Sequence, residues 1–327
     1  MGEANPPISK SGQKLVHRHL SDKALMNIFL WPTLALLIAM NIFPLLYSLY
    51  LSFTRYSAMA NKPPVWIGLE NYVKLLSDSQ LWDYFQNTGT YVLSTVLLEM
   101  IVGFSLALLL RKRFFGSGLI TTLILIPMML SPVVVGLFWK LMYNPNYGIV
   151  NYLIAFGAGQ GPDWLANRIP VSMATLNPIL ASLLKGKNLA MWAVVLVDVW
   201  MWSPFVMLLC TAGLNAIPDY LYEAAEIDRA SSWFQFWRIT LPQVSPLLLV
   251  AVLFRTIESI KAFDLLMGLT GGGPGDATEV VSINLYRTAF LGQFNTGKSS
   301  ALAYIVLIII IAASNLYIKY LNQVKEG

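Results

Sequence analysis

The sequence predicts an all-α integral membrane protein with six membrane-spanning helices. Of its 327 residues, 56% are hydrophobic and only 12% are charged, whereas charged residues make up about a quarter of a typical soluble domain. Six stretches are apolar and long enough to cross about 30 Å of hydrocarbon as helices. These stretches cover residues 24–53, 88–110, 118–143, 189–214, 244–268 and 300–320. An even number of spans places both termini on the same side of the membrane.

The connecting segments predict one membrane domain over residues 24–321, preceded by a polar extension at 1–23 and followed by a short tail at 322–327. The links at 144–188 and 270–297 are rich in Gly, Pro and Asn, which is typical of irregular surface. The first apolar run lacks a small-residue cleavage site after it, so we expect it to be retained. The lone Cys210 falls inside a predicted span, which excludes an internal disulfide or a cysteine-based metal site.

Basic residues give the orientation of the spans. With the N-terminus inside, Lys and Arg are more than twice as dense in the inner connecting segments as in the outer ones. Basic residues are enriched in cytoplasmic loops of membrane proteins. The net charge of +5 is therefore explained by orientation, without a nucleic-acid partner. Both termini and the segment 216–243 are expected in the cytoplasm.

The segment 216–243 is too polar to cross a membrane and lies between two predicted spans. Residues 219–226 contain good helix formers and an acidic first turn, which predict a short helix after Pro218. Ser231 or Ser232 can cap a second helix that Leu241 and Pro242 end. Taken alone, the pattern also fits an ordinary pair of amphipathic helices at the membrane surface.

The residue order in this segment resembles the cytoplasmic coupling loop of permease subunits in bacterial ATP-binding-cassette (ABC) importers. That loop carries E-A-A, D-G-A, F, I, L-P and P, and the sequence has the same order at the same spacing: Glu223, Ala224, Ala225, Asp228, Ala230, Phe236, Ile239, Leu241, Pro242 and Pro246. One position departs, because Arg229 stands where the family usually has glycine. Arginine tolerates a positive φ poorly, so the turn there is in question unless its backbone is right-handed.

Further segments, in the right order, resemble the carbohydrate-uptake branch of these permeases. They are Leu30-Trp31-Pro32, Phe43-Pro44, Ser52-Phe53-Thr54, residues 68–72, Ile126-Pro127, residues 269–274 and residues 286–290. Within that branch the chain looks most like the larger permease of maltose-type importers, and like an alginate-type system. The resemblance implies a type I ABC importer permease fold in a bacterial inner membrane. It also implies a second permease subunit, two ATPase subunits that bind ATP and Mg, and an external sugar-binding protein.

The resemblance assigns the coupling role to one set of residues. These are Glu223, Ala224, Ala225, Asp228, Arg229, Ala230, Leu241 and Pro242. Glu223 is expected to make a charge-assisted contact with an ATPase, while the two alanines allow close approach. No catalytic residue, cofactor or metal ligand is expected in this chain itself.

Charged residues inside the spans point to the substrate path, because they cost roughly 2.5–3.5 kcal/mol at a helix centre. Arg255, Glu258, Lys261 and Asp264 recur every three residues on the fifth span, so neighbours can form local ion pairs. A sugar needs hydroxyl-matching groups and flat apolar surfaces. We therefore expect Asp198, Trp202, Arg255, Glu258 and Lys261 to line the path; Trp200 is about 200° from Trp202 around the helix, so only one of the two faces inward. Packing or interface anchoring is the alternative role for such residues.

Residues 292–299 satisfy the phosphate-loop pattern G-x-x-x-x-G-K-S in full. A nucleotide site at such a pattern needs a preceding buried strand and a following helix in an α/β domain. Here the pattern leads straight into an apolar span on the predicted outer side. The sequence therefore disfavours a nucleotide site, and the glycines at 271–275 are interpreted as a flexible loop at the mouth of the path.

The leading hypothesis is a permease subunit of an importer for an oligosaccharide. One alternative is an importer for another solute, such as glycerol phosphate or an amino acid. A second is a stand-alone ion-coupled carrier, in which the charged fifth span would serve as a proton relay. A membrane-embedded enzyme is disfavoured, because the sequence has no legible set of nucleophile, base and orienting residue.

Overall fold

The computed structural model describes residues 21–60, 62–111, 114–154, 162–166, 188–292 and 294–326. Most of the predicted extension at 1–23, the basic residues Lys112 and Arg113, and most of the link at 144–188 lie outside these ranges. The chain forms two compact units, Met1–Tyr50 and Leu51–Gly327.

The first unit is formed mainly by α1, a helix over Asp22–Ser52 that contains Pro32 and Pro44. Large apolar side chains remain exposed along almost its whole length, including Phe29, Leu37 and Phe43. A helix that exposes this much apolar surface is suited to lipid or to another membrane helix.

The second unit is helical, apart from a two-stranded antiparallel ribbon of β1 (Thr54–Arg55) and β2 (Val65–Trp66) among its described residues. Its longer helices are α3 (Ser79–Leu110), α9 (Leu189–Asn215), α12 (Leu241–Ile260) and α15 (Thr296–Glu326). The shorter ones are α2 (Glu70–Leu76), α4 (Ser117–Leu125), α5 (Pro132–Met142), α6 (Ile149–Ile154), α10 (Tyr220–Ile227), α11 (Ser232–Gln235), α13 (Asp264–Leu269) and α14 (Val281–Phe290).

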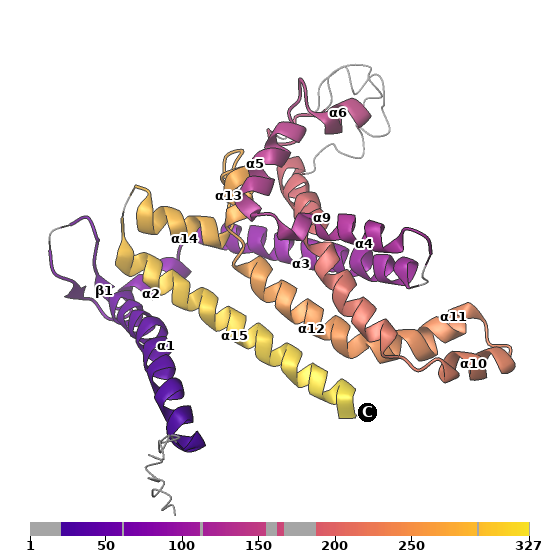
Figure 1. Ribbon diagram of the computed structural model, residues 1–327. Helices are drawn as coiled ribbons and strands as arrows, with labels where there is room; N and C mark the ends of the chain where they lie inside the picture. The colour runs from indigo at the N-terminus through magenta and orange to yellow at the C-terminus, as the bar shows by residue number, and fades with distance from the viewer. Residues whose placement is uncertain are drawn as a thin grey trace, which may run out of the picture. The chain divides into compact units, whose positions relative to one another are not determined.

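Helix α9 is the centre of this unit. In the apolar stretch of α9 that could span a membrane, 67% of the residues are buried. The helix packs against both α3 and α12. A Cβ atom on Gly103 of α3 would lie 2.6 Å from Cβ of Val206, so the glycine permits the close approach of α3 to α9. Figure 1 shows α3, α9 and α12 crossing in the middle, with α15 alongside α12.

Five described helices are long and apolar enough to span a membrane, or up to six if the bent pair α4–α5 counts as one span. The span predicted over 118–143 is bent in the structure. The two halves meet at 101°, and a short 3-10 turn at Pro127–Met129 separates them. Pro127 and Pro132 explain the break, because proline lacks the amide hydrogen that a continuous helix requires.

The fifth predicted span also differs from the structure. A helix begins at Ser232 and continues to Ile260, so Leu241 and Pro242 do not end it. A π-helical turn at Phe236–Thr240 joins α11 to α12, and the amide of Leu241 donates to the carbonyl of Phe236. The wider turn accommodates Pro242, which can donate no hydrogen bond of its own. At the other end, the predicted span 244–268 is divided into α12 and α13.

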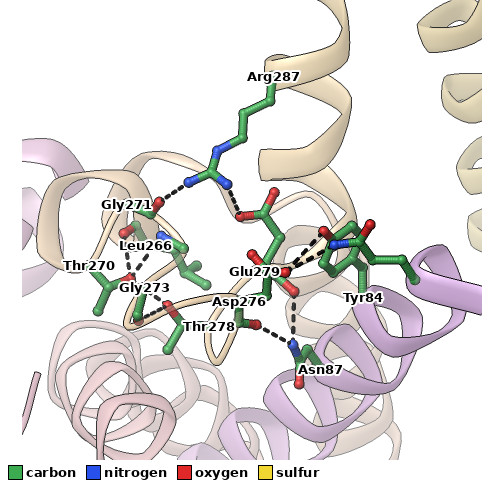
Figure 2. A network of polar contacts seen from close by, with 12 residues as sticks. Tyr84, Asn87, Leu266, Thr270, Gly271, Gly273, Asp276, Thr278, Glu279 and Arg287 are labelled. Atoms are coloured by element: carbon green, nitrogen blue, oxygen red, sulfur yellow. Dashed lines mark hydrogen bonds and ion pairs between the residues drawn. The ribbon is translucent and has the colours of Figure 1, made fainter. Parts of the chain in front are cut away.

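The link at 270–297 is also more regular than predicted, because α14 occupies its centre and the glycines at 271–275 are held in place. Arg287 donates to the Gly271 carbonyl at 2.6 Å and pairs with Glu279 at 2.7 Å, as Figure 2 shows. Thr278 donates to the Gly273 carbonyl at 2.7 Å. Burial raises the pKa of the Glu279 carboxyl, although Arg287 opposes the shift. These contacts tie Gly271 and Gly273 to neighbouring side chains in this structure.

Candidate functional site

A buried ion network joins three spans within the second unit. The Arg255 side chain on α12 donates from Nε and Nη2 to both carboxylate oxygens of Glu99 on α3, at 2.6 and 2.8 Å. Its Nη2 also donates to Asp198 on α9 at 2.9 Å and to Ser259 at 3.3 Å. All four side chains are almost completely buried. A planar guanidinium can bridge two carboxylates in this way, so Arg255 ties α3, α9 and α12 together.

All five residues predicted for the substrate path line a single pocket beside this network. They are Asp198, Trp202, Arg255, Glu258 and Lys261. The pocket has a volume of about 150 Å³, which is smaller than the roughly 300–1,000 Å³ typical of small-molecule sites. The predicted residues are therefore brought together, but the cavity in this chain alone is too small for an oligosaccharide.

The ion pairs within α12 differ from the predicted local pattern. Lys261 pairs with Glu258 at 2.7 Å, as their spacing of three residues indicates. Arg255 does not pair with Glu258; its partners lie on α3 and α9 instead. Burial explains the difference, because a charge removed from water needs the closest and best-aligned partners available.

The two tryptophans of α9 face different surroundings. The Trp202 ring lies 4.8 Å from the Arg255 guanidinium carbon, within the range of a cation–π contact. Trp200 instead packs edge-on against Trp139 of α5, with ring centroids 5.4 Å apart. The structure therefore places Trp202, and not Trp200, at the pocket.

Six further residues line the pocket besides the five predicted for the path: Pro132, Ser259, Ala262, Phe263, Asp264 and Leu265. Ser259 and Phe263 are uncharged, and nothing in their sequence context distinguishes them from packing residues. Asp264 stands out as a charge in an apolar stretch, and it lies just past the end of α12 at the start of α13. Because the chain changes direction between the two helices, Asp264 lies in the wall of the pocket.

The predicted coupling helix forms as α10, between α9 and α12. Figure 1 shows α10 and α11 at the end of these helices away from α5 and α13. Leu221 and Tyr222 pack against a core cluster that includes Leu214 of α9 and Val244 of α12. The Tyr222 hydroxyl lies 2.9 Å from that of Thr240. Helix α10 is thus joined to both helices that supply the pocket residues.

The side chains of α10 are divided between the core and the surface. Glu223, Ala224 and Asp228 are exposed, whereas Ala225 is only 8% exposed. The sequence had indicated that both alanines would allow the close approach of a partner. In the structure they do not form one free face. Ala225 serves packing within this chain, and Ala224 remains open to a partner.

Arg229 adopts the left-handed conformation that the sequence placed in question, with φ of 54°. The amide of Ala230 donates to the Ala225 carbonyl at 2.8 Å, and the amide of Arg229 donates to the Glu226 carbonyl at 3.0 Å. This pattern is the Schellman motif, which normally has glycine at the left-handed position. The turn that follows α10 is formed, but with a residue that strains it.

Replacing Arg229 by glycine should stabilise this turn by about 1 kcal/mol, because a left-handed non-glycine residue costs roughly 1–2 kcal/mol and the added chain flexibility offsets part of the gain. Hydrogen exchange at residues 228–230 should slow by about fivefold. Arg229→Ala is the matched control, since it removes the same side chain but keeps the strain. Equal protection in both variants would contradict this explanation.

The phosphate-loop pattern is explained by packing. The Gly297 amide, in the first turn of α15, donates to the Tyr56 carbonyl at 3.0 Å. A Cβ atom at this position would overlap the Thr54 carbonyl oxygen of β1. Lys298 lies 3.8 Å from Asp78. Among the described residues no α/β domain surrounds the pattern; Gln293 of the pattern lies outside them.

Gly297→Ala should destabilise the protein by about 1–3 kcal/mol, because the methyl group has no space beside the β1 backbone. Thermal unfolding of the purified protein, followed by fluorescence, measures this effect. Gly89→Ala on α3 is the control, since no atom lies within 4 Å of its added Cβ. That variant should be neutral or stabilising by up to about 1 kcal/mol. Similar melting temperatures for the two variants would contradict the packing explanation.

Comparison with known proteins assigns the chain to a family. Residues 99–324 match the family described as "Binding-protein-dependent transport system inner membrane component". The chain belongs to this family. It is therefore a multi-pass permease subunit of an ABC importer, and the polar segment that contains α10 lies within the matched region.

Several relatives of this permease are named as sugar transporters. It is 34% identical to the trehalose/maltose transport system permease protein MalF of Thermococcus litoralis, over 89% of this chain and 92% of the relative. It is 30% identical to the trehalose transport system permease protein SugA of Mycobacterium tuberculosis, over 99% and 95% of the two chains.

A solved structure shares the fold. It is a permease chain in the crystal structure of a bacterial alginate ABC transporter in complex with an alginate pentasaccharide-bound periplasmic protein. The TM-score is 0.71, and the match covers 90% of this chain and 92% of that chain. The sequence identity is 18%, so this likeness establishes the type I permease fold and not the substrate.

Proposed function

We propose that this permease carries an oligosaccharide across the membrane, after an external binding protein has delivered it and while partner subunits hydrolyse ATP. The observation that supports this most directly is the course of α9 and α12. Each runs from the α10 loop at one end to the pocket residues, Asp198 and Trp202 on α9 and Arg255 and Glu258 on α12. A displacement of α10 would therefore reach both walls of the pocket.

Two ATPase subunits would bind ATP and Mg, and one of them would hold α10. Closure of the ATPase dimer would move α10 as a rigid body together with the ends of α9 and α12. The tight packing of Gly213 against Val244 and Leu247 supports this, because a Cβ at Gly213 would lie 3.0 Å from Leu247. In this mechanism the chain itself contributes no catalytic group.

A second permease would complete the substrate site. The pocket in this chain is only about 150 Å³, whereas sites for whole ligands are usually at least about 300 Å³. The Glu258–Lys261 pair that lines the pocket is about half exposed. These groups can match sugar hydroxyls, and the Trp202 ring offers a flat apolar face.

We place this permease in a bacterial inner membrane, with α10 and both termini in the cytoplasm. The density of Lys and Arg in the connecting segments supports this orientation. The relatives' names favour a sugar over glycerol phosphate or an amino acid. An ion-coupled carrier is not favoured, because the buried carboxylates of Glu99 and Asp198 are both paired with Arg255.

Reconstitution tests this proposal. The permease, copurified with its partner subunits, is placed in proteoliposomes with the binding protein and radiolabelled oligosaccharides. Uptake should require ATP and the binding protein, and trehalose or maltose should compete. Uptake that proceeds on an ion gradient without ATPase subunits would overturn the proposal.

A further inference from the structure

The helix that follows α10 begins with an exposed aromatic segment at residues 232–240. Its exposed fractions are 71% for Trp233, 52% for Phe234 and 49% for Trp237. Trp233 and Trp237 contact each other edge-on, with ring centroids 5.6 Å apart. Phe236 instead turns inward and contacts Phe104 of α3 at 6.0 Å. One side of the segment is therefore fixed to the protein, and the other presents two tryptophans outward.

The length of the continuous helix indicates where this segment lies. The helix over Ser232–Ile260 has 29 residues, which at 1.5 Å per residue is about 43 Å. The hydrocarbon layer is only about 30 Å thick, whereas the bilayer with its headgroups is about 40–45 Å thick. A helix of this length extends beyond the hydrocarbon and into a headgroup layer.

The composition of the segment fits the headgroup layer better than the hydrocarbon. Exposed Arg238 follows Trp237 directly, and an arginine costs roughly 2.5–3.5 kcal/mol at the bilayer centre. Tryptophan is enriched at membrane–water interfaces, where its ring is apolar and its N–H can donate to water or lipid. Basic Arg238 adds attraction to acidic headgroups.

The segment is also joined to the coupling helix. Gln235 donates from its side-chain amide to the Ala230 carbonyl at 3.2 Å, and the Thr240 hydroxyl lies 2.9 Å from that of Tyr222. These contacts reach Tyr222 in the first turn of α10 and Ala230 just after its last turn. A force on the segment would therefore constrain α10 at both ends.

We propose that residues 232–240 are a membrane anchor: Trp233 and Trp237 insert into the lipid headgroup layer on the α10 side and hold the coupling helix at a fixed depth. The anchor holds α10 through Tyr222 and Ala230 while its exposed face, with Glu223, remains available to a protein partner. The bulged π-helical turn at Phe236–Thr240 forms the second half of the anchor and joins it to the transmembrane part of α12. Such a turn allows the span to tilt while the anchor stays at the surface.

Fluorescence quenching by lipids tests this inference without any dependence on substrate. The copurified transporter is placed in vesicles that contain phosphatidylcholine with a nitroxide label on the headgroup, with and without the ATPase subunits. In the unmodified protein, the labelled lipid should quench the emission of Trp233 and Trp237 whether or not the ATPases are bound. A variant with Trp233→Phe and Trp237→Phe should lose this part of the quenched emission under both conditions. Trp82→Phe is the control, because Trp82 is similarly exposed at the N-terminal end of α3.

Three outcomes decide the inference. Loss of headgroup quenching in the double variant, in both the presence and the absence of ATPases, supports it. Protection of this emission by added ATPases would mean that the tryptophans contact a protein partner, and would overturn it. An unchanged quenched fraction in the double variant would also overturn it. The uptake assay is separate, so failure of the sugar proposal does not affect this result.

Discussion

Arg255→Met should destabilise the folded permease by about 3–5 kcal/mol. The substitution leaves Glu99 and Asp198 buried without their counter-ion, and an unpaired buried charge is strongly unfavourable. The two carboxylates would also repel each other. The expected result is a large fall in the thermal midpoint and in the yield of monodisperse protein from membranes, both of which size-exclusion chromatography with fluorescence detection measures.

The matched control removes all three charges together. Glu99→Gln and Asp198→Asn combined with Arg255→Met should recover most of the lost stability, because replacing a whole buried ion network is often close to neutral. Lys261→Met provides a second control, since Lys261 and its partner Glu258 are about half exposed. This variant should change stability by less than about 1 kcal/mol. A triple variant no more stable than Arg255→Met would contradict the role of charge pairing.

Glu223→Lys should reduce ATP-driven uptake at least tenfold while leaving the protein folded. Glu223 is exposed on α10, so its reversal would remove the proposed charge-assisted contact with a partner without disturbing the core. A contact between charged groups in a buried interface is worth about 2–5 kcal/mol when one partner is lost. Uptake and ATP hydrolysis are measured on the same proteoliposomes, and the ratio of solute transported to ATP hydrolysed should fall.

Glu226→Lys is the control on the same helix. It changes the net charge equally and affects another exposed residue. If it reduced uptake as much as Glu223→Lys, a general charge effect would replace the specific contact. Normal uptake by Glu223→Lys would refute the coupling role of this residue.

Long apolar runs made most of the fold predictable. The predicted span at 189–214 and helix α9 differ by one residue at one end, because the stretch is apolar on both sides of Asp198 and the helix continues through Pro204. The break between α4 and α5 was missed because hydropathy averages over the whole run and does not register two prolines five residues apart. At Pro242 the error was the reverse, because the proline was predicted to end a helix that in fact continues. A π-helical turn accommodates this proline, although a proline usually ends a helix.

The site was only partly predictable. Intramembrane charge is costly, which singled out residues that the structure does bring to one pocket. Sequence spacing found the pair Glu258–Lys261, because those residues are neighbours on one helix. It could not find the partners of Arg255. Glu99 lies 156 residues away along the chain, and only the packing of α3 against α12 brings the two side chains together.

The contact between α5 and α13 affects how the pocket can change its volume. Gly136 of α5 and Gly268 of α13 allow backbone-to-backbone contact, since a Cβ on Gly136 would lie 2.8 Å from the Leu265 carbonyl oxygen. Pro132 and Leu265, which lie on these two helices, form one wall of the pocket. Because the two backbones touch, that wall should move as a single block. Widening of the pocket must then be taken up between α12 and α13, at residues 261–263. Spin labels on α5 and α13 should keep a constant separation during turnover, whereas labels on α12 and α13 should not.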